Sequence, residues 1–419
     1  MVKLYKHQEE AVEYLKQFNN CLIGDDMGLG KTFEGSEMMM FYKNQVNLVV
    51  CQKSKVDDWV EHFDKYYEGV LNYDLTNKKF FETFLKEIDD LEPWETGVGI
   101  INYDLLIRRP QLQQLQDFTL LLDESSEIKN ETSKRAKYIL NMNPTNVILL
   151  TGTPMNGKFE ELWSQLKLLG WNINRDLFHK QYMNFEIDRK QGFPRKVFTG
   201  YKNKERLLKK LHDYGGVFRK TEEVYELPSQ TDIPLKIANT SEYKKFDKNK
   251  YVCFDDIEII GDSVLTERLG KRLLCGVHNK NKIQAYKDLI NSTNDRLIVF
   301  YNFNAELELL ESVTDRPISY MNGSCKDLSA YEEHDDSVTF VQYQSGSMGL
   351  NLQKANKIVY FTPPDGNSIH FEQSKKRTHR LGQNKPCFYY YLIVEGSVEE
   401  EIYSTLGVRK VNNDELFKK

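Results

Sequence analysis

Ten short apolar runs, separated by stretches of helical periodicity, constrain the fold of this chain more than any other feature. In the first half the runs are Cys21–Gly24, Leu48–Cys51, Val98–Ile101, Leu120–Leu122 and Val147–Leu150. In the second half they are Leu297–Tyr301, Ile318–Met321, Val338–Tyr343, Ile358–Phe361 and Phe388–Ile393. Runs of this length with helices between them are typical of parallel strands buried on both faces. The pattern therefore predicts an α/β fold in which a doubly wound parallel sheet occurs twice.

The two groups of strands predict two domains in tandem. A domain of roughly 100–200 residues can bury its own core, so a chain of 419 residues has room for two or three. The stretch from Leu227 to about Thr240, which opens with Leu-Pro-Ser, is interpreted as the crossover between them. We expect a first lobe over residues 1–228, with a basic helical protrusion near 175–226, and a second lobe over residues 229–419.

A glycine-rich string follows the first apolar run and opens a helical stretch. It reads Asp25-Asp26-Met27-Gly28-Leu29-Gly30-Lys31-Thr32. Glycines let backbone N–H groups approach phosphates, and the N-terminus of a helix adds a favourable dipole for anions. We expect the residues from Asp26 to Thr32 to bind ATP. In this interpretation Lys31 reaches the β- and γ-phosphates, and the hydroxyl of Thr32 is a ligand of Mg²⁺.

Two further motifs follow later strands of the first half. Asp123 and Glu124 come directly after the run Leu120–Leu122. We expect Asp123 to hold Mg²⁺ through water and Glu124 to orient and polarise the attacking water. The run Val147–Leu150 ends in Thr151-Gly152-Thr153-Pro154, a polar turn that would lie beside the acidic pair and sense the γ-phosphate.

With these three motifs in this order, the chain resembles helicase superfamily two and, within it, the Swi/Snf-type ATPases. The string DDMGLGKT is close to that branch's phosphate loop, and Gln8 in Leu4-Tyr5-Lys6-His7-Gln8 matches its reader of adenine. The string Phe218-Arg219-Lys220-Thr221 is also similar to the branch. The resemblance implies nucleic-acid contacts in the first lobe at Lys53, Ser54, Tyr103, Lys129, Asn130 and Thr151.

The most specific string of the chain lies in the second half and runs from Gln373 to Gln383. It resembles the last motif of the same branch, which implies that Arg377 and Arg380 are arginine fingers and that Gln373 contacts ATP. A planar guanidinium donates two hydrogen bonds to the charge that spreads over a phosphate in transfer. The preceding string, from Ser345 to Leu352, is similar to the motif that joins DNA contact to ATP contact, and it implies nucleic-acid contacts at Ser345, Ser347 and Asn351.

The resemblance covers nearly the whole chain except residues 251–265 and implies two RecA-like lobes with the ATP site in the cleft between them. It implies a DNA-dependent ATPase of compact form, without accessory domains, that uses ATP and Mg²⁺ and translocates along double-stranded DNA. Contacts to the phosphate backbone carry no sequence information, so no sequence specificity is expected. Two alternatives stay open: a strand-separating helicase on DNA or RNA, and an ATP-gated clamp that binds duplex without productive turnover.

Charge and composition restrict the remaining classes. No apolar run approaches the roughly 20 residues of a membrane span, and residues 1–8 lack the apolar core of a signal peptide, so we expect a cytoplasmic protein. The net charge of −5 hides a local excess, because the stretch from Arg189 to Lys220 contains eleven Lys or Arg against two acidic residues. This run is interpreted as a duplex-contacting protrusion. We expect a monomer of bacterial or bacteriophage origin, with replication or recombination proteins as partners.

Overall fold

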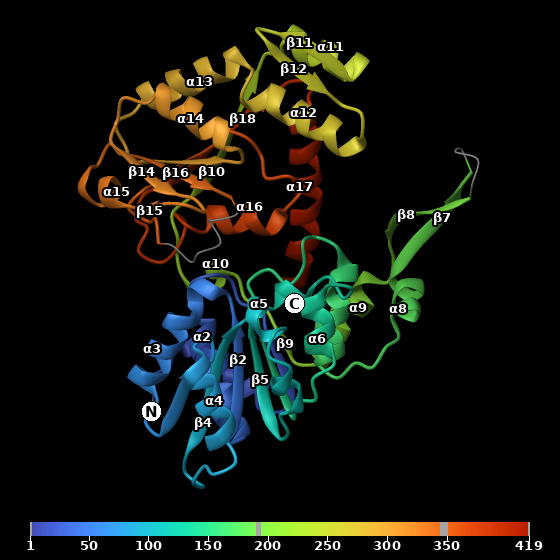
Figure 1. Cartoon of the computed structure of the whole chain (residues 1–419), viewed down its shortest axis with the longest axis vertical. Coiled ribbons are helices and arrows are strands. Elements are labelled where there is room, and N and C mark those ends of the chain that lie inside the picture. Colours follow the sequence, from blue (N-terminus) through green and yellow to red (C-terminus); the bar gives the residue numbers. More distant parts are fainter. Residues whose placement is uncertain (1, 190–193, 344–350, 418–419) are drawn as a thin grey trace. The chain divides into compact units, whose positions relative to one another are not determined.

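The computed structural model describes residues 2–189, 194–343 and 351–417 (Figure 1). The chain divides into two compact units: unit 1 comprises Met1–Val224 and Asn412–Lys419, and unit 2 comprises Tyr225–Val411. Each unit contains a seven-stranded sheet. The predicted α/β class with two mostly parallel sheets in tandem is therefore confirmed. The last eight residues differ from the expected division, since they group with unit 1 rather than with the second half.

The sheet of unit 1 is parallel throughout and has the strand order β3-β4-β2-β5-β6-β1-β9. In chain order the strands are β1 (Asn20–Ile23), β2 (Val46–Cys51), β3 (Val70–Asp74), β4 (Thr96–Asn102), β5 (Phe118–Asp123), β6 (Asn146–Leu150) and β9 (Gly216–Val217). The central strands are almost entirely buried. The two edge strands, β3 and β9, were not predicted because β3 is only half apolar and β9 has two residues.

Helices connect these strands, as a parallel sheet requires. The helices of unit 1 are α1 (Lys6–Leu15), α2 (Lys31–Tyr42), α3 (Val56–Tyr66), α4 (Lys78–Glu87), α5 (Tyr103–Leu106), α6 (Lys134–Leu140), α7 (Trp163–Leu168), α8 (Arg175–Tyr182), α9 (Lys204–Asp213) and α10 (Thr221–Val224). Two buried apolar clusters, one on each face of the sheet, include alternate residues of the same strands: Leu48 and Val50 of β2 belong to one, and Val49 and Cys51 to the other.

The sheet of unit 2 has the order β10-β18-β17-β13-β16-β14-β15, and only the β14–β15 pair is antiparallel. Its strands are β10 (Gln230–Ile237), β13 (Leu297–Tyr301), β14 (Ile318–Met321), β15 (Lys326–Asp327), β16 (Val338–Gln342), β17 (Lys357–Tyr360) and β18 (Cys387–Val394). The expected crossover over residues 227–240 is largely strand β10, which pairs with β18 along its full length.

The helices of unit 2 lie between and after the strands of this sheet along the chain. They are α11 (Ser241–Asn249), α12 (Val264–Gly276), α13 (Lys280–Asn291), α14 (Asn304–Ser312), α15 (Ser329–Glu333), α16 (Ser368–Lys375) and α17 (Val398–Asp414), whose last residues group with unit 1. The segment 251–265, which the sequence resemblance left out, forms the hairpin of β11 (Tyr251–Phe254) and β12 (Ile257–Ile260) and leads into α12. Across the described ranges, no helix has the length and apolar character needed to span a membrane.

The segment 175–226, expected to be a helical protrusion, is only partly helical. Between α8 and α9 the chain forms an antiparallel hairpin of β7 (Met183–Asp188) and β8 (Arg195–Tyr201), with a register shift between Asn184 and Phe185. Figure 1 shows this hairpin extending away from α8 and α9. Alternating residues such as Phe185, Ile187 and Phe198 favour strands rather than helix, which is the physical reason for the difference.

Candidate functional site

The glycine-rich string forms the connection between β1 and α2. Gly28 and Gly30 both have positive φ angles, 90° and 84°, a region in which most side chains are strained. Gly30 is the N-cap of α2, so the loop ends on the N-terminus of a helix, an arrangement that binds phosphate. The amine Nζ of Lys31 donates to the carbonyl oxygens of Asp25 at 2.6 Å and Asp26 at 3.0 Å, which holds it against the loop.

Helix α1 packs directly on this loop through Gln8. Its Nε2 donates to the carbonyl oxygens of Leu29 at 3.0 Å and Gly30 at 3.3 Å, while its Oε1 accepts from the N–H of Tyr5 at 2.9 Å. A Cβ atom at Gly30 would lie 2.2 Å from Nε2 of Gln8, and the φ of 84° also favours glycine at this position. Gln8 therefore lies beside the predicted nucleotide loop. Its role as reader of adenine stays a prediction.

The segment after β9 braces the other side of the loop. The N–H of Asp26 donates to the carbonyl oxygen of Arg219 at 2.9 Å. The carboxylate of Asp26 accepts from the N–H of Thr221 at 3.1 Å and from its hydroxyl at 3.3 Å. The sequence showed the string Phe218–Thr221 only as a family resemblance and assigned it no part in the site. Its proximity to the loop depends on β9 pairing with β1.

Two fully buried carboxyl groups, Asp25 and Glu34, are near neighbours beneath the loop. Burial raises the pKa of Asp25 to about 6, although Arg219 and Lys31 act against the shift. Burial, and secondly the charge of Asp25, raise the pKa of Glu34 well above its ordinary range. Burial and the proximity of the two carboxyls therefore both disfavour the state in which both are ionised. Sequence reasoning missed Glu34, because one acidic residue within a helix carries no signal of burial.

The acidic pair lies at the carboxyl end of β5. Burial raises the pKa of Asp123, and the indole N–H of Trp59 donates to its Oδ2 at 2.9 Å and opposes that shift. Glu124 has a φ of 55°, a strained value for a residue with a side chain. The hydroxyl of Thr151 donates to Oε2 of Glu124 at 3.4 Å. The contact of Trp59 with Asp123 joins residues 64 positions apart and is not visible in the sequence.

The three motifs of the first lobe meet at one edge of the sheet. Strands β5, β6 and β1 are neighbours, and the motifs follow their carboxyl ends. A Cβ atom at Gly152, in the turn after β6, would lie 3.5 Å from Nζ of Lys31. Parallel sheets bind ligands at this edge. The structure therefore brings Lys31, Glu124 and Thr151 into one region.

The same edge has the donors that Mg²⁺ prefers. The described residues contain no cluster of three His, Cys, Asp or Glu side chains that could hold a metal ion by themselves. Mg²⁺ bound with a nucleotide needs only one or two protein oxygens in addition to phosphates and water. The hydroxyl of Thr32 and the carboxylate of Asp123 fit that requirement in chemistry.

Two of the predicted nucleic-acid contacts in unit 1 are buried. Tyr103 is 3% exposed, and its hydroxyl donates to the carbonyl oxygen of Asp123 at 2.9 Å. Thr151 has no exposed surface. Their burial does not support direct contact with nucleic acid, and their hydrogen bonds indicate that they position the acidic pair instead. The sequence did not indicate the burial of these two residues, because each directly follows a strand and lies outside the apolar run.

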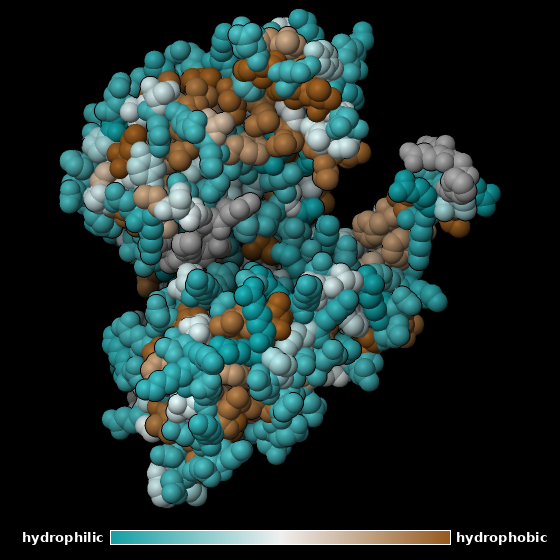
Figure 2. Space-filling view, in the orientation of Figure 1, coloured by the Kyte–Doolittle hydropathy of each residue, from teal (hydrophilic) through white to brown (hydrophobic). Residues whose placement is uncertain are grey.

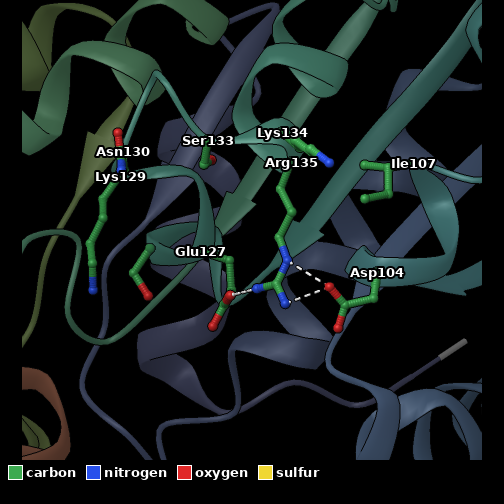
Figure 3. Close-up of a pocket in the computed structure, with 9 residues that line it drawn as sticks. Asp104, Ile107, Glu127, Lys129, Asn130, Ser133, Lys134 and Arg135 are labelled. Atoms are coloured by element: carbon green, nitrogen blue, oxygen red, sulfur yellow. Dashed lines mark hydrogen bonds and ion pairs between the residues drawn. The ribbon is translucent and has the colours of Figure 1, made fainter.

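The other predicted contacts of unit 1 lie on its surface. Lys53 and Ser54 are exposed in a short 3₁₀ turn (Lys53–Lys55) after β2. Lys129 and Asn130 line a pocket of about 390 Å³ whose other lining residues are Asp104, Ile107, Ser126, Glu127, Ser133, Lys134 and Arg135. Figure 3 shows the guanidinium of Arg135 between two carboxylates, donating to Asp104 at 2.6 Å and to Glu127. The two carboxylates compensate the charge of Arg135. Lys129 and Lys134 are the other cations that line the pocket.

In unit 2 the two predicted fingers differ in their surroundings. Arg377 is 2% exposed, and its backbone carbonyl accepts from the N–H of Leu352 at 3.1 Å. Arg380 is partly exposed, and its guanidinium donates to Oδ1 of Asn351. Gln373 is buried within α16. Ser345 and Ser347, the other predicted contacts of this unit, lie outside the described residues.

Comparison with protein families gives two adjoining matches. The family described as SNF2-related domain matches residues 6–285, and the family described as Helicase conserved C-terminal domain matches residues 281–382. The first match alone covers about two thirds of the chain.

Similar proteins of established name are distant in sequence. Chromodomain-helicase-DNA-binding protein 1-like of Mus musculus is 23% identical over 96% of this chain and 49% of its own length. The ISWI chromatin-remodeling complex ATPase ISW1 of Saccharomyces cerevisiae is 24% identical over 99% of this chain and 40% of its own. The chain spans about half the length of the curated relatives it matches. A solved Sulfolobus solfataricus SWI2/SNF2 ATPase core in complex with dsDNA is 20% identical, with a TM-score of 0.45, and covers 99% of this chain and 92% of that chain.

Proposed function

The chain belongs to the SNF2-related family, and on that premise we propose that it is a DNA-dependent ATPase that translocates along double-stranded DNA. The observation that carries the ATPase part is the meeting of Lys31, Glu124 and Thr151 at the carboxyl edge of strands β1, β5 and β6. Relatives whose names describe helicases and chromatin-remodelling ATPases support the same function.

The roles of the side chains in unit 1 follow from their chemistry. Lys31 neutralises the β- and γ-phosphates, and the N–H groups of the loop from Asp26 to Thr32 orient them. Thr32 and Asp123 would hold Mg²⁺, which would supply positive charge to the phosphates when bound. Glu124 orients the attacking water, and its bond to Thr151 supports that role. Thr151 then connects the state of the γ-phosphate to the turn after β6.

Arginine from unit 2 completes the proposed reaction. A cation that acts on the transferring phosphoryl group stabilises the transition state more than the ground state. Because the phosphate loop and the arginines belong to different units, hydrolysis then requires the units to close on one nucleotide, and product release allows them to open. Alternating grip on the backbone by the two units would move the protein along the duplex without reading its sequence.

The experiment that tests the proposal is the steady-state ATPase rate with double-stranded DNA, single-stranded DNA, RNA or no nucleic acid. Stimulation by duplex, absent in Lys31→Ala, is the expected result. A nucleic-acid-independent rate, or no turnover by the wild type, would refute it. Displacement of a strand from a forked substrate would identify a strand-separating helicase, and duplex binding without turnover would identify an ATP-gated clamp.

A further inference from the structure

The β7–β8 hairpin carries apolar surface that the fold of unit 1 does not use. Ile187 is 63% exposed and Phe198 43%, and the strand register places both on one face of the hairpin, whereas Val197, 42% exposed, lies on the other face. A two-stranded hairpin is marginally stable by itself, and grouped apolar side chains on a surface mark a contact with another molecule. Figure 2 shows this apolar area as brown and tan atoms beside hydrophilic ones on the hairpin. The hairpin therefore presents a mixed apolar and polar surface to solvent.

Its base is fixed to the rest of unit 1 by specific bonds. The hydroxyl of Tyr201 donates to Oε2 of Glu160 at 2.6 Å. The N–H of Lys202 donates to the carbonyl oxygen of Tyr182 at 3.0 Å, and the side-chain amide of Asn203 donates to the carbonyl oxygen of Gln181 at 2.8 Å. Because both strands are anchored where they leave α8 and enter α9, the base of the hairpin holds its side chains in a defined arrangement.

Three lysines surround a hollow of about 530 Å³ at this base. Lys180 comes from α8, Lys196 from β8 and Lys202 from the residue after β8, and the other lining residues are Met183, Asn184, Phe185, Glu186 and Thr199. Glu186 is the one acidic residue of the lining, and it forms no ion pair with these lysines, all of which the structure describes. Lys196 lies over the ring of Phe185 at 4.2 Å from its centroid, which orients its amine.

We infer that this hollow binds phosphates of the backbone of duplex DNA through Lys180, Lys196 and Lys202, with the apolar side chains of the hairpin along the adjoining groove. The inference rests on the proposed function and names a binding element within it. Lysine amines act as point charges and do not require a fixed plane of oxygens, which suits successive phosphates. The major groove of a duplex admits a two-stranded ribbon, and apolar side chains that pack on the sugars along it make contacts without sequence information. An acidic protein surface could bind the three lysines, but it offers no groove for the apolar side chains of the hairpin.

The test is duplex binding by the triple variant Lys180→Ala, Lys196→Ala, Lys202→Ala as a function of salt concentration. Each lost phosphate contact reduces the slope of log affinity against log salt by about 0.9, so the slope falls by about 2.7. At about 0.1 M salt the affinity falls by roughly 10²-fold for the same reason. The basal ATPase rate without DNA stays at the wild-type value and serves as the check on folding.

A matched control removes three exposed lysines elsewhere in unit 1. Lys78, Lys79 and Lys86 lie on α4 and are exposed, so their replacement by alanine changes the net charge equally. The control keeps at least nine tenths of the wild-type slope. A slope unchanged in the hairpin variant, or an equal loss in the control, would overturn the inference.

A second variant tests the apolar part separately. Ile187→Ser with Phe198→Ser lowers duplex affinity several-fold and leaves the salt slope unchanged, because no charge is removed. Loss of binding to single-stranded DNA or polyglutamate, with duplex binding intact, would assign the hairpin to another ligand and contradict the inference. If the wild-type ATPase responds to duplex while both variants bind as the wild type does, the inference fails and the proposed function stands. If the wild type neither binds nor responds to duplex, both fail.

Discussion

Unit 1 and unit 2 hold their predicted catalytic side chains by different means. In unit 1 the backbone places them: Lys31 and Glu124 follow neighbouring parallel strands, and their positions follow from strand pairing. In unit 2 side-chain packing places them. Arg377 and Arg380 both lie in the turns after α16; Arg377 is buried, and the guanidinium of Arg380 donates to Asn351. The difference teaches that motif spacing locates the first site directly, whereas the two arginines of one motif have different surroundings that the motif does not show.

The largest expected effect comes from Arg380→Ala. Its guanidinium is the more exposed of the two, so we expect it to be the group that reaches the γ-phosphate. Arginine fingers contribute roughly 10³–10⁵ in rate, so DNA-stimulated turnover falls by at least 10³-fold while ATP affinity stays within a few-fold. ATPase rate and nucleotide affinity with and without duplex measure both quantities. Full turnover in this variant would remove the finger role.

Arg377→Ala gives the contrasting result within the same motif. Removal of this large buried side chain leaves a cavity and costs about 2–5 kcal/mol, so we expect the stability of unit 2 to fall. Denaturant unfolding measures the loss, and Arg377→Lys recovers part of it. A stable Arg377→Ala protein that binds ATP but has lost turnover would instead make both arginines fingers, as the sequence predicted.

Glu124→Gln has the next effect. The amide keeps the shape of the side chain but no longer polarises the attacking water, so turnover falls by roughly 10²–10⁴-fold with ATP binding retained. The matched control is Glu127→Gln, because Glu127 is bonded to Arg135. We expect the control to retain turnover within a few-fold. Near-normal hydrolysis by Glu124→Gln would show that Glu124, although placed beside the phosphate loop, does not polarise the attacking water.

Trp59→Phe tests how the environment of Asp123 supports the metal. The variant loses the indole N–H that donates to Oδ2 of Asp123. A hydrogen bond to a charged group contributes about 1.5–3 kcal/mol, so we expect roughly tenfold lower turnover at limiting Mg²⁺ and recovery at high Mg²⁺. Titration of the ATPase rate with Mg²⁺ measures this. A loss of turnover that is equal at all Mg²⁺ concentrations would show that Trp59 does not support metal binding.

The smallest effect concerns cations outside the catalytic groups. Lys209 is exposed on α9, while Lys210 lies 3.7 Å from Asp213. In unit 2, by contrast, Lys375 is buried and bonded to Asp232 at 2.9 Å, so its charge is already compensated. Lys209→Glu with Lys210→Glu is expected to weaken duplex binding by about tenfold at low salt and spare basal turnover. Unchanged affinity would return α9 to an ordinary solvated surface.

The fold was largely predictable because its strands are continuous apolar runs. All ten predicted strands overlap strands of the two sheets. Prediction failed where the apolar signal was short or mixed, as in the edge strands β3 and β9. It also failed in the β7–β8 hairpin, because β8 is exposed and its basic residues were interpreted as part of a helical protrusion. The phosphate loop and acidic pair were equally visible, because glycines and acids directly after apolar strands are local patterns.

The sequence by itself determined the α/β class, the order of the motifs and the residue types at each step of the proposed reaction. These depend on the period of apolar residues and on the chemistry of neighbouring positions along the chain. Only the tertiary structure decided which side chains those motifs touch: Thr221 against Asp26, Trp59 against Asp123, and Glu34 against Asp25. It also buried Tyr103 and Thr151, for which the resemblance had implied nucleic-acid contacts. The physical reason is that burial and partner choice come from strand pairing between distant segments, which no local pattern records.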